Sequence, residues 1–342
     1  MKPTEVTTVL EAMFKGNCPV LIIGPPGMGK SDIVEQATKA AGADLILSHP
    51  AVADPTDAKG LPWPGKDGKT ATFLPFGELA RAIEAKKPTV WFLDDLGQAP
   101  PSVQASFMQL LLARRVNDHT ISDEVTFVAA TNRRTDRAGV SGILEPVKSR
   151  FTTIIELEPD LDDWCQWAFG NDIPVELIAF LRFRPELLCK FEASADLTNS
   201  PVPRTWAAVG KMMKMDLPRA VQQAAFAGAV GAGASLEFLS FLRLYRDLPS
   251  IDGILIDPNS AIVPTEPAAM YAVVTALAAK ANQANFDRIA EYATRVVDAG
   301  RAEFAALLFR DSVARHPEVQ HTKGFVQLVS SELGQLMSGE VR

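Results

Sequence analysis

The sequence contains few residues of the kinds that bind transition metals or form disulfides. Among 342 residues there are 3 cysteines and 4 histidines. Cys18, Cys165 and Cys189 are far apart and share no C-x-x-C spacing, so the pattern predicts free thiols rather than a disulfide framework or a zinc site. His316 and His321 are five positions apart, which is the wrong spacing for one helix face. We therefore expect no transition-metal site.

Long apolar runs and excess positive charge are missing too. No window approaches the ~18 uninterrupted apolar residues of a membrane span. The N-terminal stretch MKPTEVTTVLEAMF is acidic and amphipathic, unlike a secretory signal. The net charge of −7 means that the chain as a whole lacks the excess positive charge typical of nucleic-acid-binding proteins. These features predict a cytosolic protein, in a cell or in a cell infected by a virus, without a membrane partner and with nucleic acid disfavoured as a partner.

The first half of the chain alternates between strand-like and helix-like segments. This alternation predicts an α/β fold with a parallel sheet between helices. Two further segments, 60–74 and 115–127, predict hairpins that turn at Lys66–Gly68 and near Asn117–Asp118. The expected strands are 19–24, 43–52, 89–96, 125–132 and 151–157, and the expected helices are 31–42, 76–87 and 101–115.

From about residue 160 the pattern becomes helical. Apolar residues recur at helical spacing in seven stretches, among them LDDWCQWAFG, PVELIAFLRFRPELL and FDRIAEYATRVVDAG. We therefore place a domain boundary near residue 158 and expect only helices after it.

The octapeptide GPPGMGKS at 24–31 matches the phosphate-binding pattern G-x-x-x-x-G-K-[ST], between an apolar strand and a helix. Its glycines allow the backbone amides to turn inward, and the helix N-terminus adds partial positive charge. The alternative is a glycine-rich turn with a solvated lysine. The expected nucleotide-binding residues are Gly24, Pro25, Pro26, Gly27, Met28, Gly29, Lys30, Ser31 and Asp32, with Lys30 on the β/γ phosphates and Ser31 on Mg²⁺.

Two adjacent acids, Asp94 and Asp95, end the apolar run in VWFLDDLGQAPP. Beside a phosphate loop, Asp94 is expected to help hold the Mg²⁺ bound at Ser31, which relieves the repulsion between two buried carboxylates. A strand-end turn is the alternative reading. Asp95 stands where many nucleotide-hydrolysing strands have glutamate.

Asn132 ends the next expected strand, in ATNRR. It is a candidate to orient the attacking water, although a turn-forming asparagine is the simpler interpretation. Several arginines follow and are candidates for an arginine finger: Arg133, Arg134, Arg137 and Arg150. Arg150 directly precedes an apolar strand, so the core fixes its position, and we expect it to reach a neighbouring subunit's nucleotide.

Taken as an ordered set, these motifs resemble those of the AAA+ ATPases, and within them the MoxR family. The resemblance covers roughly residues 1–215. The stretches that carry it are GPPGMGKS, DPTDAKGLP, FLDDLGQAPPSVQASFMQLLLARRV, ATNRR, LEPVKSRF and SPVPRTWAAV.

The resemblance implies a role for each matching residue. Ser31 and Asp94 would hold Mg²⁺, Asp95 would be the catalytic carboxylate and Asn132 the first sensor. Arg150 would be the finger in trans, and Arg204 the second sensor on a helical lid. It also implies an AAA+ core at 1–158, a lid at 159–220 and a helical region of unknown role at 221–342.

The resemblance further implies a hexameric ring that binds ATP and Mg²⁺, acts as a chaperone on a target complex and works with a partner carrying a von Willebrand factor A domain. Similar short forms occur in bacteriophages and prophages. Two other functions stay open. Asp95 is one methylene shorter than glutamate, which favours a nucleotide-gated binding module that hydrolyses ATP slowly. A DNA-directed motor is the other, since the first hairpin contains Trp63, Lys66 and Lys69.

Overall fold

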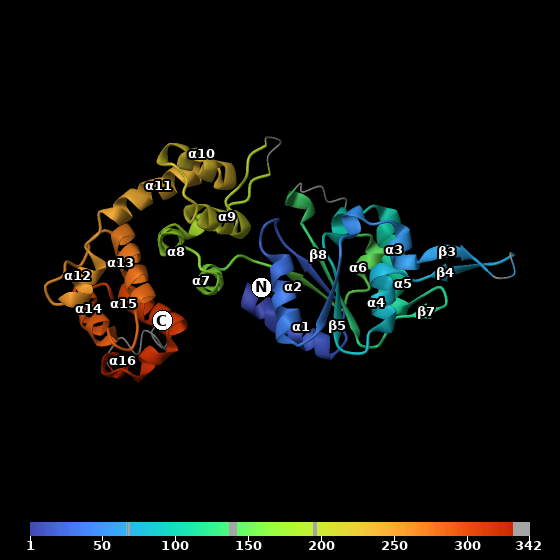
Figure 1. The fold of residues 1–342 in the computed structure, drawn as a ribbon, viewed down its shortest axis with the longest axis horizontal. Helices are drawn as coiled ribbons and strands as arrows, with labels where there is room; N and C mark the ends of the chain where they lie inside the picture. Colours follow the sequence, from blue (N-terminus) through green and yellow to red (C-terminus); the bar gives the residue numbers. More distant parts are fainter. Residues whose placement is uncertain (66, 68, 137–141, 194–196, 331–342) are drawn as a thin grey trace. The chain divides into compact units, whose positions relative to one another are not determined.

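The computed structural model describes residues 1–342 except 66, 68, 137–141, 194–196 and 331–342. The chain folds into two compact units (Figure 1). The first consists of Met1–Asp163 with Phe191–Asp196, and the second of Trp164–Lys190 with Leu197–Arg342. The functional division into core, lid and C-terminal region, with boundaries at 158 and 220, stays a prediction.

The first unit is built on a parallel five-stranded sheet, which confirms the predicted α/β fold. Its strand order is β2-β5-β8-β1-β9. Each of the five predicted strands is present, and each is shorter than the apolar run that predicted it. The bounds are β1 Val20–Ile23, β2 Asp44–Ser48, β5 Thr89–Leu93, β8 Val125–Thr131 and β9 Thr153–Glu156.

Helices cover both faces of this sheet (Figure 1). Alternate strand residues point to opposite faces, and Leu21, Trp91 and Phe127 lie in one core with residues of the helices that follow β2 and β5. Trp91 stacks on Phe127 at 5.3 Å between ring centroids and meets the edge of Phe107 at 6.1 Å. The helices are α1 Pro3–Lys15, α2 Lys30–Ala40, α3 Pro55–Lys59, α4 Gly77–Glu84, α5 Pro101–Ala113 and α6 Glu145–Lys148.

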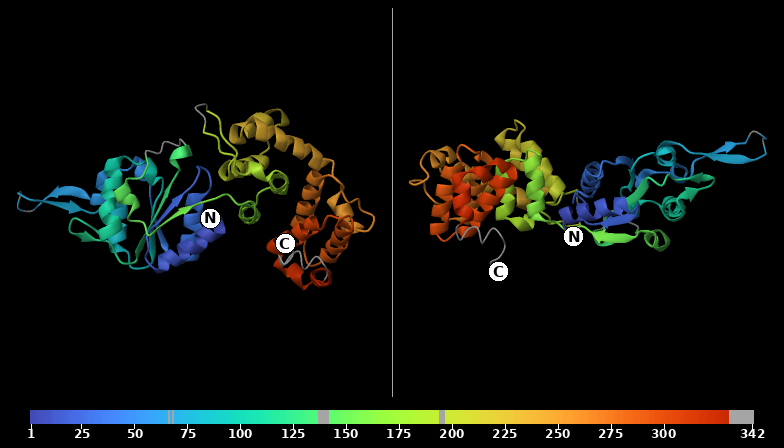
Figure 2. Two further views of the ribbon diagram at one scale, coloured as in Figure 1. Left: turned by 180° about the vertical axis from the view of Figure 1, so that it is seen from behind. Right: turned by 90° about the horizontal axis from the view of Figure 1, so that it is seen from below.

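Both predicted hairpins form, one from β3 Leu61–Pro64 and β4 Ala71–Leu74, the other from β6 Arg115–Val116 and β7 His119–Thr120. The predicted turn residues Lys66 and Gly68 lie outside the described residues. Figure 2 shows the first hairpin extending away from the sheet. Its strands are exposed along their whole length.

The two open edges of the first hairpin are protected differently. The Gly65 amide donates to the Thr70 carbonyl at 2.8 Å, so the alternation of the ladder turns the nitrogens of Pro62 and Pro64 away from β4. Proline has no N–H, and the β3 edge therefore offers no amide at these positions. On the β4 edge, the Phe73 carbonyl lies 2.8 Å from His119 Nε2 of the second hairpin.

The second unit is helical, as predicted. Three of its helices, α10, α12 and α16, were not expected. The expected helix at 174–188 ends early, at Phe183, because Pro185 disfavours helical backbone at the preceding residue. The helices are α7 Leu161–Gly170 (which starts in the first unit), α8 Val175–Phe183, α9 Pro203–Met213, α10 Arg219–Val230, α11 Ala232–Arg246, α12 Ile251–Ile256, α13 Pro267–Lys280, α14 Phe286–Asp298, α15 Ala302–Arg315 and α16 Lys323–Val329.

A buried ion pair joins two helices of this unit that are distant in sequence. The guanidinium of Arg182 on α8 donates two hydrogen bonds to the carboxylate of Asp311 on α15, one of them at 2.7 Å. Their side chains are 3% and 1% exposed. Burial alone would lower the pKa of Arg182, but the hydrogen bonds and charge of Asp311 outweigh it and raise the pKa. Helices α8 and α15 therefore belong to one packed body.

No helix within the described residues is long and apolar enough to span a bilayer.

Candidate nucleotide-binding site

The GPPGMGKS loop connects the end of β1 to the start of α2, as predicted. Gly27 and Gly29 have φ of 77° and 87°, a left-handed conformation that glycine adopts without steric cost. Gly29 is the residue immediately before α2, so the first free amides of this helix lie within the loop. Such amides, together with the helix dipole, form an anion-binding cradle.

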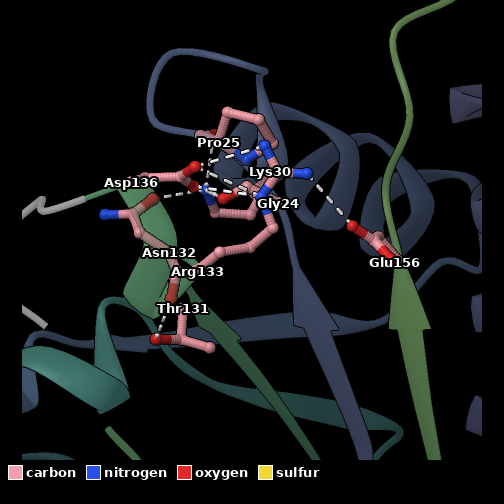
Figure 3. Close-up of polar contacts among 8 residues, drawn as sticks. All are labelled: Gly24, Pro25, Lys30, Thr131, Asn132, Arg133, Asp136 and Glu156. Atoms are coloured by element: carbon pink, nitrogen blue, oxygen red, sulfur yellow. Dashed lines mark hydrogen bonds and ion pairs between the residues drawn. The ribbon is translucent and has the colours of Figure 1, made fainter. Parts of the chain in front are cut away.

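The ammonium group of Lys30 lies against this loop and contacts its backbone carbonyls (Figure 3). Lys30 is 7% exposed, and its Nζ donates to the carbonyl oxygens of Gly24 and Pro25, both at 3.0 Å. It also donates to Oδ1 of Asn132, at the end of β8, at 2.7 Å. The contact brings together two residues that the sequence assigned separately to phosphate binding and to sensing. It also turns the amide nitrogen of Asn132 away from Lys30.

Ser31 and Asp94 meet as predicted from the magnesium hypothesis. Ser31 Oγ donates to Asp94 Oδ2 at 2.6 Å, linking the start of α2 to the end of β5. A hydroxyl and a carboxylate oxygen are the hard ligands that Mg²⁺ takes at nucleotide sites, where the substrate and water complete the shell. Within the described residues, no group of three or more His, Cys, Asp and Glu side chains could hold a metal by itself. Ser31 Oγ and Asp94 Oδ2 are thus the oxygens that could hold Mg²⁺ beside a nucleotide, and this role stays a prediction.

Asp95 has an unusual backbone conformation. Its φ and ψ are 56° and 34°, in the left-handed region, and its amide donates to Asp94 Oδ1 at 3.0 Å. Aspartate and asparagine occur there several times more often than other non-glycine residues. The two acids are half-buried, not fully buried as the sequence suggested.

Arg133 forms ion pairs with acidic residues of its own chain (Figure 3). Its guanidinium donates to both carboxylate oxygens of Asp136, at 3.2–3.3 Å, and to Glu156 Oε1 on β9 at 3.1 Å. The hydrogen bond to Asp136 is the main reason why the pKa of Arg133 is raised, while burial opposes it and Glu156 adds to it. These ion pairs tie the end of β8 to β9 and make Arg133 a poor candidate for a finger in trans.

The remaining candidate arginines differ in position. Arg134 is exposed, and Arg137 lies outside the described residues. Arg150 is half-buried, two residues after the end of α6, and its Nη1 donates to the Pro146 carbonyl. Arg204 is exposed in the first turn of α9, in the helical unit. The roles of Arg150 and Arg204 stay predictions.

Residues 19–151 match the family model described as an AAA domain of the dynein-related subfamily. These residues have a P-loop AAA+ fold. The matched segment includes the phosphate loop, the Asp94–Asp95 pair and Asn132, which lie at the carboxyl edge of one sheet, and this fold is typical of nucleotide-binding domains.

One curated relative is ATPase family gene 2 protein homolog B from Homo sapiens, 30% identical over 139 residues. The match covers 38% of this chain, which spans only 16% of the relative's length. Among solved structures, a RuvB Holliday junction branch migration motor from Thermotoga maritima has a TM-score of 0.39 at 16% identity, covering 81% of this chain and 80% of RuvB. NtrX from Brucella abortus in complex with ADP has a TM-score of 0.41 at 12% identity, covering 98% of this chain and 67% of NtrX.

Proposed function

We propose that this protein is a Mg²⁺-dependent ATPase that works in a ring of identical subunits, most simply a hexamer, and remodels a protein partner. The observation that carries the proposal is the convergence of four side chains from the start of α2 and from the ends of β5 and β8. Lys30 contacts Asn132 at 2.7 Å, and Ser31 contacts Asp94 at 2.6 Å. Neither contact is needed for a simple glycine-rich turn.

Each residue has a distinct task in hydrolysis. The loop amides and Lys30 bind the phosphates, and Ser31 and Asp94 would hold Mg²⁺, which neutralises phosphate charge when bound. Asn132 would orient a water against the γ-phosphorus with its amide nitrogen. Asp95 would accept a proton from that water as the new P–O bond forms and the bond to the β,γ-bridging oxygen breaks, giving ADP and phosphate.

The proposal of a ring is based on Arg150 and Arg204, because neither residue has a role in an isolated nucleotide site of this kind. Arg150 is fixed from two sides, by α6 before it and by the Phe151 side chain after it, which is 8% exposed. A guanidinium held in this way is suited to stabilise charge on a neighbouring subunit's γ-phosphate. Arg204 would contact nucleotide from the helical unit.

Remodelling of a partner is what the resemblance to the MoxR family suggests, together with an accessory protein that carries a von Willebrand factor A domain. The first hairpin supports a partner-binding role, since Leu61, Trp63 and Leu74 are 47%, 60% and 46% exposed. Affinity purification of the chain with bound ATP from its natural host tests this. Recovery of no protein with such a domain would contradict this choice of partner.

The test of trans catalysis mixes Arg150→Ala subunits with Lys30→Ala subunits and follows ATP turnover. Neither variant should hydrolyse ATP alone, but turnover should return in the mixture, because an Arg150→Ala subunit keeps its phosphate loop and can receive the finger of a Lys30→Ala neighbour. Lys148→Ala is the matched control and should keep turnover by itself, since Lys148 lies two positions from Arg150 and pairs with exposed Glu145 at 2.6 Å. Absence of turnover at every mixing ratio would contradict a finger in trans.

A second candidate function is a nucleotide-gated binding module that rarely hydrolyses ATP. It is favoured by Asp95, whose carboxylate is one methylene shorter than that of glutamate. A misplacement of about 1 Å can slow a reaction about 100-fold. If Asp95→Glu raises turnover many-fold while partner recruitment needs only bound ATP, this second function replaces the first.

A further inference from the structure

Gln104 is a buried polar residue that none of the sequence motifs assigns a role. It lies on α5, is 1% exposed, and uses its side-chain amide entirely on backbone groups outside its own helix. Its Nε2 donates to the carbonyls of Ala99 at 3.0 Å and Gly142 at 2.9 Å. Its Oε1 accepts from the Leu144 amide at 2.9 Å.

One of these partners belongs to the turn that begins at Asp95. The Gln98 amide donates to the Asp95 carbonyl at 2.9 Å, and the Ala99 amide to the Leu96 carbonyl at 3.1 Å. Asp95 through Ala99 therefore form one tight hydrogen-bonded turn. Gln104 holds its last residue, whose side chain is fully buried.

The other two partners belong to the segment that leads to Arg150. The Leu144 carbonyl accepts from the Val147 amide at 2.8 Å, and the Val147 carbonyl accepts from the Arg150 amide at 3.1 Å. The segment thus runs from Gly142 through α6 to Arg150 as a second hydrogen-bonded unit. Gln104 holds its beginning.

We propose that Gln104 is a positioning residue that couples the turn carrying Asp95 to the segment carrying Arg150. This proposal rests on the proposed function, because it gives the two ends their catalytic tasks. A buried amide with three backbone partners has one favourable arrangement, since any shift leaves a buried donor or acceptor unpaired. A movement of the Asp95 turn on nucleotide binding is therefore passed to Arg150, which the ring model places against the next subunit.

The test measures hydrogen exchange of the full-length chain with and without ADP as the probe. In the wild type, ADP should slow exchange both in a peptide covering 24–32 and in one covering 142–150. Gln104→Met keeps the length of the side chain and removes its three hydrogen bonds. It should keep the response of 24–32 and lose that of 142–150.

Two further variants make the result specific. Ser106→Ala is the control: Ser106 is also 1% exposed on α5, but its hydroxyl donates to Ser102 of the same helix, so both responses should remain. Leu144→Pro removes the amide that donates to Gln104 and replaces a leucine side chain that packs against the core, while the φ of −58° at this position already suits proline. It should lose the response of 142–150 as Gln104→Met does, even if the latter folds poorly.

Turnover gives an independent readout. Gln104→Met should lower kcat about tenfold with ADP affinity unchanged, and much less when Arg150→Ala is already present. A response of 142–150 that survives in both variants overturns the coupling, as does a wild type in which only 24–32 responds. A wild type in which neither peptide responds removes the proposed function as well.

Discussion

Substitutions at Asp95 can separate two effects: the free-energy cost of its left-handed backbone and the role of its carboxylate in hydrolysis. We compare Asp95→Ala with Asp95→Gly, because both remove the side chain and differ only in the backbone. At φ 56° an ordinary L-residue costs about 1–2 kcal/mol, and glycine avoids this cost. Glycine also gives the unfolded chain more freedom, which offsets about 0.4–1 kcal/mol.

The net expectation is that Asp95→Gly is more stable than Asp95→Ala by about 0.5–1 kcal/mol. For a unit of this size that raises the melting temperature by about 1–4 °C, which calorimetry of the first transition resolves. Both variants should lack turnover, and so should Asp95→Asn, which tolerates the left-handed region. Equal melting temperatures for the glycine and alanine variants would refute backbone strain at Asp95. Full turnover in the asparagine variant would refute the role of Asp95 as the general base.

Three shorter predictions concern other parts of the chain. Asp311→Asn leaves the charge of the buried Arg182 guanidinium uncompensated and should lower the unfolding free energy of the helical unit by about 3–5 kcal/mol in urea titrations. Glu237→Gln, in a half-buried pair with Arg184, should cost under about 1 kcal/mol. Equal losses from the two substitutions would contradict the expectation that the Arg182–Asp311 pair matters more. Ser31→Ala should raise the Mg²⁺ concentration needed for half-maximal turnover about tenfold. An unchanged Mg²⁺ requirement would show that the hydroxyl is not a ligand. Trp63→Ala should leave melting unchanged, whereas Trp91→Ala, at a 1% exposed ring, should cost about 3–5 kcal/mol.

The sheet and the phosphate loop could be predicted because their signals are local. A β-branched apolar run between turn residues predicts a strand buried on both faces, and β1, β5 and β8 follow this rule. The pairing of Ser31 with Asp94 also follows, because the carboxyl ends of parallel strands share one edge. Helix α10 was missed because its AVQQAAFAGAV pattern is rich in alanine and has a weak apolar stripe.

Other parts of the site could not be predicted because they depend on contacts between distant segments. The main partner of Arg133, Asp136, is only three residues away, but the spacing alone did not show that the two side chains meet, and the second partner, Glu156, lies on the distant strand β9. Arg133 therefore looked as available as Arg150. The three partners of Gln104 are backbone groups, and backbone groups have no sequence signature. The left-handed backbone at Asp95 was equally hidden, although it offers a reason for aspartate at a position where reach alone favours glutamate.

The prolines of β3 have a consequence for how the first hairpin could bind a polypeptide. An extended peptide normally joins an exposed hairpin by adding a strand to its edge, and such binding depends little on sequence. Pro62 and Pro64 remove the amide donors on one side, and His119 occupies a carbonyl on the other. If the hairpin binds a polypeptide, strand addition finds fewer backbone partners at these positions, so side-chain contacts with Trp63 and its apolar neighbours would carry more of the recognition. The same loss disfavours edge-to-edge pairing of two hairpins.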